Sequence, residues 1–137
     1  MSVKPIISDP VFLVQPAQTA TPSDLLLAID LRDTLIAHKR DAAGLAANMI
    51  GGQKQIIACY IGMLPIIMLN PRLTFKQDQY QIAEGCLSLA GERQAVRCRE
   101  IVVSYQDLKW IPHAQKLSGF VAEVVQHELD HCHGILI

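Results

Sequence analysis

The chain carries its strand signals in one continuous central region, residues 55–107, and this feature limits most strongly the folds that it can adopt. Three short β-branched runs, QIIACYIG, PIIMLN and EIVVSYQD, are typical of strands, and Gly62 and the pair Asn70-Pro71 end the first two. Between the second and third runs lies AEGCLSLAGE, whose glycines indicate an irregular loop. We therefore expect several strands in this region, interrupted by a loop at residues 83–92.

Helical patterns precede and follow the strand region in the sequence. In residues 21–40, leucines recur on one helical face, and Ser23 is the expected N-cap. The small, glycine-dotted segment DAAGLAANMIGGQKQ follows and is interpreted as a loop. A last helix is expected to begin after Ser118 and to end at Gly134. A helix, a set of mostly antiparallel strands and a second helix predict an α+β fold.

The size and charge of the chain exclude several functional classes. With 137 residues it is expected to form one domain, residues 1–137, and its formal net charge of −1 offers no basic surface to nucleic acid. Its apolar runs are too short for a membrane helix, and its first residues lack an apolar signal segment, so we expect a cytoplasmic protein without a membrane partner. The irregular spacing of Cys59, Cys86, Cys98 and Cys132 favours reduced thiols or a metal ligand over disulfides.

The last helix carries two histidines that can bind one cation. His127 and His131 are four residues apart, so their side chains project from one face, on the same stripe as Phe120 and Val124. Glu128 lies beside the first histidine without pointing in the ligand direction, as in the H-E-x-x-H pattern of metal hydrolases. The alternative, two ordinary histidines on a partly buried helix, is about equally compatible with these residues alone.

A catalytic cation site of this type needs a third protein ligand and an open position for water. Only three residues follow Gly134, so the third ligand is sought in the loop EGCLS, where Cys86 lies between Gly85 and Leu87. A thiolate at Cys86 would complete a Cys-His-His set, and Gly85 would let the backbone lie against the metal or a substrate. The alternative for Cys86 is a small buried side chain, the most common state of a free cysteine.

Together, EGCLS, QHELDH and the upstream GLAANMIGG resemble the motifs of the peptide deformylase family, in the same order. The resemblance extends from about Val3 to Ile137. It implies the fold of that family and one divalent metal ion, often Fe²⁺ in the cell and replaceable by Zn²⁺ or Ni²⁺. It also implies hydrolysis of the N-formyl group from the first methionine of new polypeptides, so the expected partner is an N-formyl-Met peptide or nascent chain.

Matched position by position, the resemblance makes Cys86, His127 and His131 the metal ligands and Glu128 the general base. A bound cation would make a water molecule more acidic, and Glu128 would take its proton and pass it to the leaving amine. The resemblance also assigns the backbone N–H of Leu87 to the oxyanion that develops during the reaction.

Further matched residues surround this set. Glu84 and Asp130 occupy acidic positions of the family's motifs, where a carboxylate would orient a ligand imidazole, and Arg97 matches an arginine that follows the cysteine loop. A solvated surface charge is the alternative for each, and for Arg97 both interpretations are equally open. Gly44 and Gly85 match positions beside the substrate.

The first motif departs from the family pattern G-x-G-x-A-A-x-Q at two positions. Ala42 replaces its first glycine, and Met49 replaces the glutamine whose amide donates a hydrogen bond to the formyl oxygen of the substrate in the family. Methionine has no donor, and losing one such bond costs about 3 kcal/mol at the transition state. Asn48 and Gln53 carry amides nearby, and Met49 itself could offer its thioether to the metal or simply fill the pocket wall.

We therefore expect a deformylase with weakened activity. Two alternatives remain, namely a metal enzyme that hydrolyses another N-acyl or amide substrate, and a non-catalytic protein that binds metal or peptide. The intact Glu128 favours an enzyme, since a protein that only binds metal needs no base beside its ligands. The chain ends at GILI, whereas bacterial members commonly continue into a segment implicated in ribosome docking, so the sequence does not support the ribosome as a partner.

Overall fold

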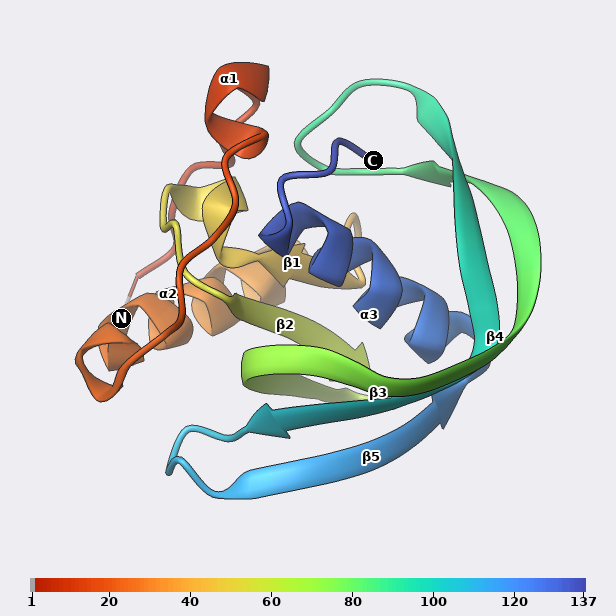
Figure 1. Ribbon diagram of the computed structural model, residues 1–137. Coiled ribbons are helices and arrows are strands. Elements are labelled where there is room, and N and C mark those ends of the chain that lie inside the picture. The colour runs from red at the N-terminus through yellow and green to blue at the C-terminus, as the bar shows by residue number, and fades with distance from the viewer. Residues whose placement is uncertain (1) are drawn as a thin grey trace.

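The computed structural model describes residues 2–137 and contains one five-stranded antiparallel sheet, in the order β1-β2-β3-β4-β5, with helices packed on it (Figure 1). Its elements in chain order are α1 (Pro10–Leu13), the 3-10 turn η1 (Pro22–Asp24), α2 (Leu25–Ala37), β1 (Gly44–Ala46), the 3-10 turn η2 (Ala47–Ile50), β2 (Ile56–Ile61), β3 (Leu64–Gly85), β4 (Glu92–Gln106), β5 (Pro112–Ser118) and α3 (Gly119–Cys132). The expected α+β class is confirmed. Within residues 2–137, no helix is both long and apolar enough to cross a membrane.

The ribbon formed by β3 and β4 brings distant parts of the chain to one place. The two strands pair antiparallel over most of their length, and their register shifts near Leu69 and Leu73. Such irregularities bend a strand and increase its twist. Figure 1 shows the ribbon curving around α3, and the loop that follows Gly85 thereby reaches the side of α3 that carries His131.

The apolar core lies between the sheet and the helices α2 and α3. On α2, Ala28, Leu31 and Leu35 are fully buried, as expected for leucines at helical spacing. On α3, Ala122 and Val125 are fully buried against the same core. Removing these faces from water is what holds both helices on the sheet.

The start of α2 shows that the prediction of Ser23 as its N-cap was wrong. The chain first makes η1, in which the backbone N–H of Thr21 donates to the Asp24 carboxylate at 2.8 Å. α2 follows directly and is shorter than the expected range 21–40. Pro22 explains the shift, because its fixed φ suits the first helical position and places the cap of η1 two residues earlier, at Thr21.

Two strands were not indicated by their own sequences. The expected loop at residues 41–55 contains β1 and η2, because residues 44–46 pair with residues 57–59 of β2. β5 carries no apolar alternation, yet it pairs along its whole length with β4. In both strands the partner decides the conformation more than the intrinsic preference of the residues does.

α3 begins after Ser118 and stops before Gly134, as predicted. Ser118 occupies the N-cap position, although its side chain makes no capping hydrogen bond within residues 2–137. Gly134 has a φ of +74°, the left-handed conformation that commonly ends helices. The amide of Gln126 then fixes α3 to β4, because it accepts from the N–H of Cys98 and donates to the Cys98 carbonyl, each at 2.8 Å.

Gly44 in β1 allows α3 to lie close to the sheet. A Cβ at this position would lie 2.6 Å from Cγ1 of Val124 and 3.2 Å from the carbonyl oxygen of Ala58. At Gly85, the nearest described atom that a Cβ would meet is the carbonyl oxygen of Gly91, at 4.0 Å. These two glycines therefore form a matched pair, one closely packed and one open.

We predict that Gly44→Ala lowers the free energy of unfolding by about 1–3 kcal/mol, because a methyl group forced into this contact must displace α3. Gly85→Ala should change the free energy by less than about 0.5 kcal/mol. Urea denaturation followed by circular dichroism measures both values. Equal stability of the two variants would contradict the close packing of β1 against α3.

Candidate metal centre

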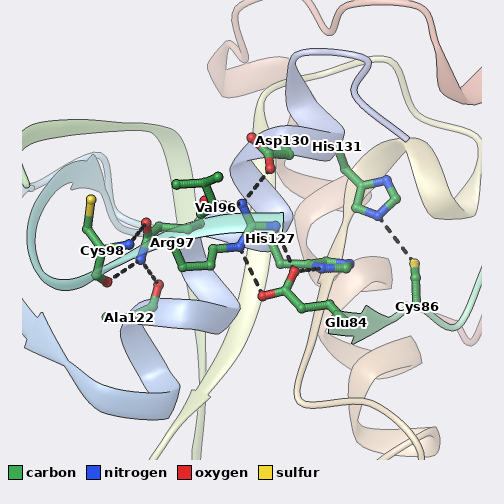
Figure 2. A network of polar contacts seen from close by, with 10 residues as sticks. Glu84, Cys86, Val96, Arg97, Cys98, Ala122, His127, Asp130 and His131 are labelled. Carbon is green, nitrogen blue, oxygen red and sulfur yellow. Dashed lines mark hydrogen bonds and ion pairs between the residues drawn. The ribbon is translucent and has the colours of Figure 1, made fainter. Parts of the chain in front are cut away.

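α3 and the loop that follows β3 bring three metal-binding side chains together. His127 and His131 project from successive turns of α3, and Cys86 comes from the loop between β3 and β4 (Figure 2). One ligand atom of each residue lies within 4.8 Å of the other two. The sulfur of Cys86 lies 3.2 Å from Nε2 of His131, and the two imidazole centres are 5.1 Å apart. The three residues singled out in the sequence thus lie in one cluster.

The cluster has the chemistry of a site for one divalent cation. One thiolate and two imidazole nitrogens suit zinc or iron, and three protein ligands leave a coordination position for water. Beside the cluster, Oε1 of the buried Glu128 has no hydrogen-bond partner among the described residues. A buried carboxylate oxygen without a partner is costly, and a nearby cation or water would stabilise it. The residues therefore fit a divalent metal ion.

A buried ion pair supports His127 from the side opposite the cluster. Nε and Nη2 of Arg97 donate to the two carboxylate oxygens of Glu84, at 2.9 and 2.7 Å, and Nη1 donates to Asp130 at 2.7 Å. Oε1 of Glu84 also lies 2.8 Å from Nδ1 of His127 (Figure 2). Arg97 is only 3% exposed, which decides between the two interpretations of this residue in favour of a buried partner for a carboxylate.

This network fixes the orientation of His127. Burial alone would raise the pKa of Glu84, but hydrogen bonds from His127 and Arg97 outweigh it and lower that pKa to about 2. Glu84 is therefore an anion that accepts the Nδ1–H of His127, which leaves Nε2 to face the cluster. Burial also disfavours the charged form of His127, yet hydrogen bonds to Cys86 and Glu84 raise its pKa to about 10. A cation must displace this proton in order to bind.

Burial shifts the pKa values of Glu128 and His131 in opposite directions. It raises the pKa of the Glu128 carboxyl to about 7. It lowers the pKa of His131 to about 4, and the positive charges of His127 and Arg97 act in the same direction. Glu128 can thus gain and lose a proton near neutral pH, as a general base must, and neutral His131 has a lone pair available for a cation.

A pocket of about 450 Å³ opens beside the cluster. Its wall includes the residues expected at the substrate or in the chemistry, with the exception of the fully buried His131. These wall residues are Gly44, Met49, Gly85, Cys86, Leu87, His127 and Glu128. The rest of the wall includes Phe120, Glu123 and Val124 of α3, together with Asp41. Phe120 is 66% exposed, so it forms part of the rim of this pocket and does not face the core with the rest of its stripe.

Met49 is buried in the pocket wall, with its sulfur turned to the backbone of its own segment. The N–H of Ala46 donates to Sδ at 3.4 Å, and the side chain is 1% exposed. This contact favours the pocket-filling role over a thioether ligand, the two uses that the sequence left open. Since the sulfur has no proton to donate, the wall lacks a side-chain donor at this position.

Neither neighbouring amide supplies the missing donor. Nδ2 of Asn48 donates to the carbonyl oxygen of His131 at 3.0 Å, and Nε2 of Gln53 donates to the side chain of Gln15. Neither Asn48 nor Gln53 lines the pocket. Asn48 instead ties η2 to the ligand-bearing end of α3, a role that no local pattern indicates because the two residues are 83 positions apart.

The other cysteines belong to the apolar core. Cys59, Cys98 and Cys132 are at most 4% exposed, and Cys59 lies in the core as its apolar neighbours indicated. All four cysteines of the described residues are free thiols, which agrees with the expectation of no disulfide framework.

Comparison with known proteins identifies relatives along nearly the whole chain. A family model described as polypeptide deformylase matches residues 4–137. The peptide deformylase of Clostridium beijerinckii is 42% identical over 135 residues, which cover 98% of this chain and 99% of that protein. The peptide deformylase of Chlorobaculum parvum is 31% identical over 139 residues, covering 94% of this chain and 73% of that protein.

Solved structures agree with these sequence relatives. The class I type b peptide deformylase from Acinetobacter baumannii with bound Met-Ala-Ser has a TM-score of 0.88 at 26% identity, covering 99% of this chain and 97% of that one. A peptide deformylase from Synechococcus elongatus in complex with actinonin has a TM-score of 0.82 at 32% identity, covering 97% and 74%. Since sequence, fold and ligand cluster agree, the chain belongs to the polypeptide deformylase family of metal-dependent hydrolases.

Proposed function

We propose that this protein removes the N-formyl group from formyl-Met peptides, with Cys86, His127 and His131 holding one divalent metal ion and Glu128 acting as the base. One observation carries the proposal: three ligand atoms lie within 4.8 Å of one another at the wall of a pocket, beside the buried Glu128, whose Oε1 has no hydrogen-bond partner among the described residues. Membership of the polypeptide deformylase family supports the same function.

Different groups in the wall of the pocket have different roles in the proposed reaction. A bound metal ion would act as a Lewis acid and make a water molecule acidic near neutral pH. Glu128 accepts the proton of the attacking water, and its raised pKa, about 7, suits it to pass that proton to the leaving amine. We assign the N–H of Leu87, in the pocket wall, to the formyl oxygen. The products are formate and a free amino terminus.

The same pocket residues support proposals about how the peptide is bound and which metal ion is used. We assign Gly44 and Gly85, which line the pocket from β1 and from the end of β3, to the backbone of the bound peptide. We propose Fe²⁺ as the ion in the cell, with Zn²⁺ or Ni²⁺ as substitutes, because a thiolate and two imidazoles suit all three. Newly made polypeptides are the proposed substrate, which places the activity in the cytoplasm.

We predict that Fe²⁺-loaded protein, prepared without oxygen, releases formate from formyl-Met-Ala-Ser and leaves acetyl-Met-Ala-Ser intact. The value of kcat/KM should fall as the pH decreases below about 7, because Glu128 with a raised pKa becomes protonated there. The charge of a bound cation lowers this pKa, so the midpoint lies at or below that value. Assays of formate release across pH 5–9 measure the profile.

Glu128→Gln is the matched variant for this experiment. It should keep its metal and lose hydrolysis by a factor of about 10²–10⁴, because an amide cannot accept the proton of water. Loss of the metal in this variant would make Glu128 a structural residue. Equal cleavage of the acetyl peptide by the wild type would instead identify an enzyme of broader N-acyl specificity, and binding without turnover of either peptide would identify a non-catalytic protein.

We also predict that deformylation is slow because of Met49, and that Met49→Gln raises kcat/KM by roughly tenfold to a thousandfold, the range for one oxyanion donor. The gain should lie mainly in kcat, since a bond to the formyl oxygen strengthens as charge develops on it. Met49→Leu has a similar volume and no donor, so it should give no such gain. If Met49→Gln and Met49→Leu have the same rate, the missing donor does not limit the reaction.

A further inference from the structure

The ring of His131 has one nitrogen that faces away from the ligand cluster and needs a partner. Nε2 lies 3.2 Å from the sulfur of Cys86, so it is the nitrogen that faces the cluster (Figure 2). An imidazole that binds a cation is neutral, and with Nε2 as the ligand atom its single ring proton lies on Nδ1. Nδ1 is buried and has no hydrogen-bond partner among the described residues. Because a buried donor without an acceptor is costly, this N–H requires an acceptor.

The other histidine of the cluster shows what such an acceptor does. Nδ1 of His127 lies 2.8 Å from Oε1 of Glu84, and this carboxylate holds the ring with Nε2 turned to the cluster. In the part of the chain that the structure describes, no carboxylate bonds to Nδ1 of His131. The two histidines therefore differ in the group that orients each ring, although they project from successive turns of one helix.

Asn48 carries a buried acceptor that also lacks a partner. Its side chain is 2% exposed, and its Oδ1 makes no hydrogen bond within residues 2–137. Its Nδ2 donates to the backbone carbonyl oxygen of His131 at 3.0 Å. Oδ1 is bonded to the same carbon atom as Nδ2, so it also lies close to His131. An unpaired donor and an unpaired acceptor thus belong to two residues that are already in contact.

A water molecule can satisfy both atoms. Since neither Nδ1 of His131 nor Oδ1 of Asn48 has a partner among the described residues, the two are not bonded to each other directly. Buried water molecules typically bond to polar groups that have no other partner, and a bridge of this kind is nearly as favourable in enthalpy as a direct hydrogen bond.

Ser88 offers the competing acceptor. Its Oγ is buried and unpaired in the described chain, and it lies two residues after Cys86. Its Oγ makes no hydrogen bond to His131, whereas the Asn48 amide bonds to the carbonyl of that residue. Asn48 is therefore the better candidate.

We propose that Asn48 is a positioning residue for the metal ligand His131, because its Oδ1 accepts the Nδ1–H of His131 through one buried water molecule and keeps Nε2 turned to the cation. Its Nδ2 holds the His131 carbonyl at the same time, so one amide fixes both the backbone and the ring of this ligand. The inference rests on the proposed metal centre, since Nδ1 must carry the proton when Nε2 binds the ion.

Proton–nitrogen correlation NMR of zinc-loaded protein with ¹⁵N-labelled histidines observes this proton directly. In the wild type, we expect the Nδ1–H of His131 to give a signal that exchanges slowly with solvent. Asn48→Leu should lose this signal, because leucine accepts no hydrogen bond. Asn48→Asp keeps an acceptor oxygen, so it should keep the signal and move it downfield, since a charged acceptor makes a stronger bond.

The aspartate variant separates the acceptor role from a structural one. If Asn48 serves only to hold the His131 carbonyl, the ionised aspartate and leucine should act alike, because both lack the donor Nδ2. Equal His131 signals in the two variants would overturn the inference, and so would a signal that only Ser88→Ala removes. Asn48→Asp decides the question even if Asn48→Leu does not fold.

Zinc affinity measures the consequence for the metal centre. Competition with a chromophoric chelator should show that Asn48→Leu raises the Kd for zinc roughly 10- to 100-fold, the range for losing the outer partner of a ligand. Gln53→Leu is the matched control, because the amide of Gln53 donates to Gln15 and not to α3, so its Kd should equal that of the wild type. A wild-type Kd in Asn48→Leu would contradict the proposal.

These measurements separate the inference from the function on which it rests. Zinc binding by a wild type that hydrolyses no formyl-Met peptide would overturn the proposed reaction alone, and the NMR signals and zinc affinities would still decide the role of Asn48. If the wild type binds no zinc, the proposed metal centre fails and the inference fails with it.

Discussion

The buried ion pair between Arg97 and Glu84 is the interaction on which the rest of the site depends. It joins β4 to β3, and the further bonds of Arg97 to Asp130 and of Glu84 to His127 join both strands to α3. Removing one partner of such a pair typically costs about 3–5 kcal/mol, because the other charge is left buried without compensation. Since Glu84 also orients His127, the proposed metal ligand on α3 depends on Arg97 of β4.

One half of the proposed metal centre matches the family pattern and the other half does not. The ligand atoms of Cys86, His127 and His131 lie within 4.8 Å of one another, and Glu128, the proposed base, lines the same pocket. Met49 fills the wall where the family has an amide donor, and its sulfur accepts a hydrogen bond from the backbone instead of offering one to a substrate. We therefore expect normal metal binding combined with weak stabilisation of the developing oxyanion.

The sequence was sufficient for the features that local rules decide. Helical spacing placed His127 and His131 on one face, and the need for a third ligand led to Cys86. It was not sufficient to predict the ion-pair network of Arg97 that orients His127, because Arg97 lies 13 residues from Glu84 and 33 from Asp130. Only the pairing of β3 with β4 decides whether the charge of Arg97 is buried. The strands β1 and β5 were missed for the same physical reason, since their partners and not their own residues determine them.

X-ray absorption spectroscopy of the zinc-loaded protein most directly tests whether Cys86, His127 and His131 hold one cation. We predict one sulfur neighbour at about 2.3 Å and two nitrogen neighbours at about 2.0 Å from the metal. The sulfur neighbour should be absent in Cys86→Ala and present in Cys98→Ala, because Cys98 is a core thiol outside the cluster. A wild-type spectrum that contains only nitrogen and oxygen neighbours would contradict the assignment of the metal centre.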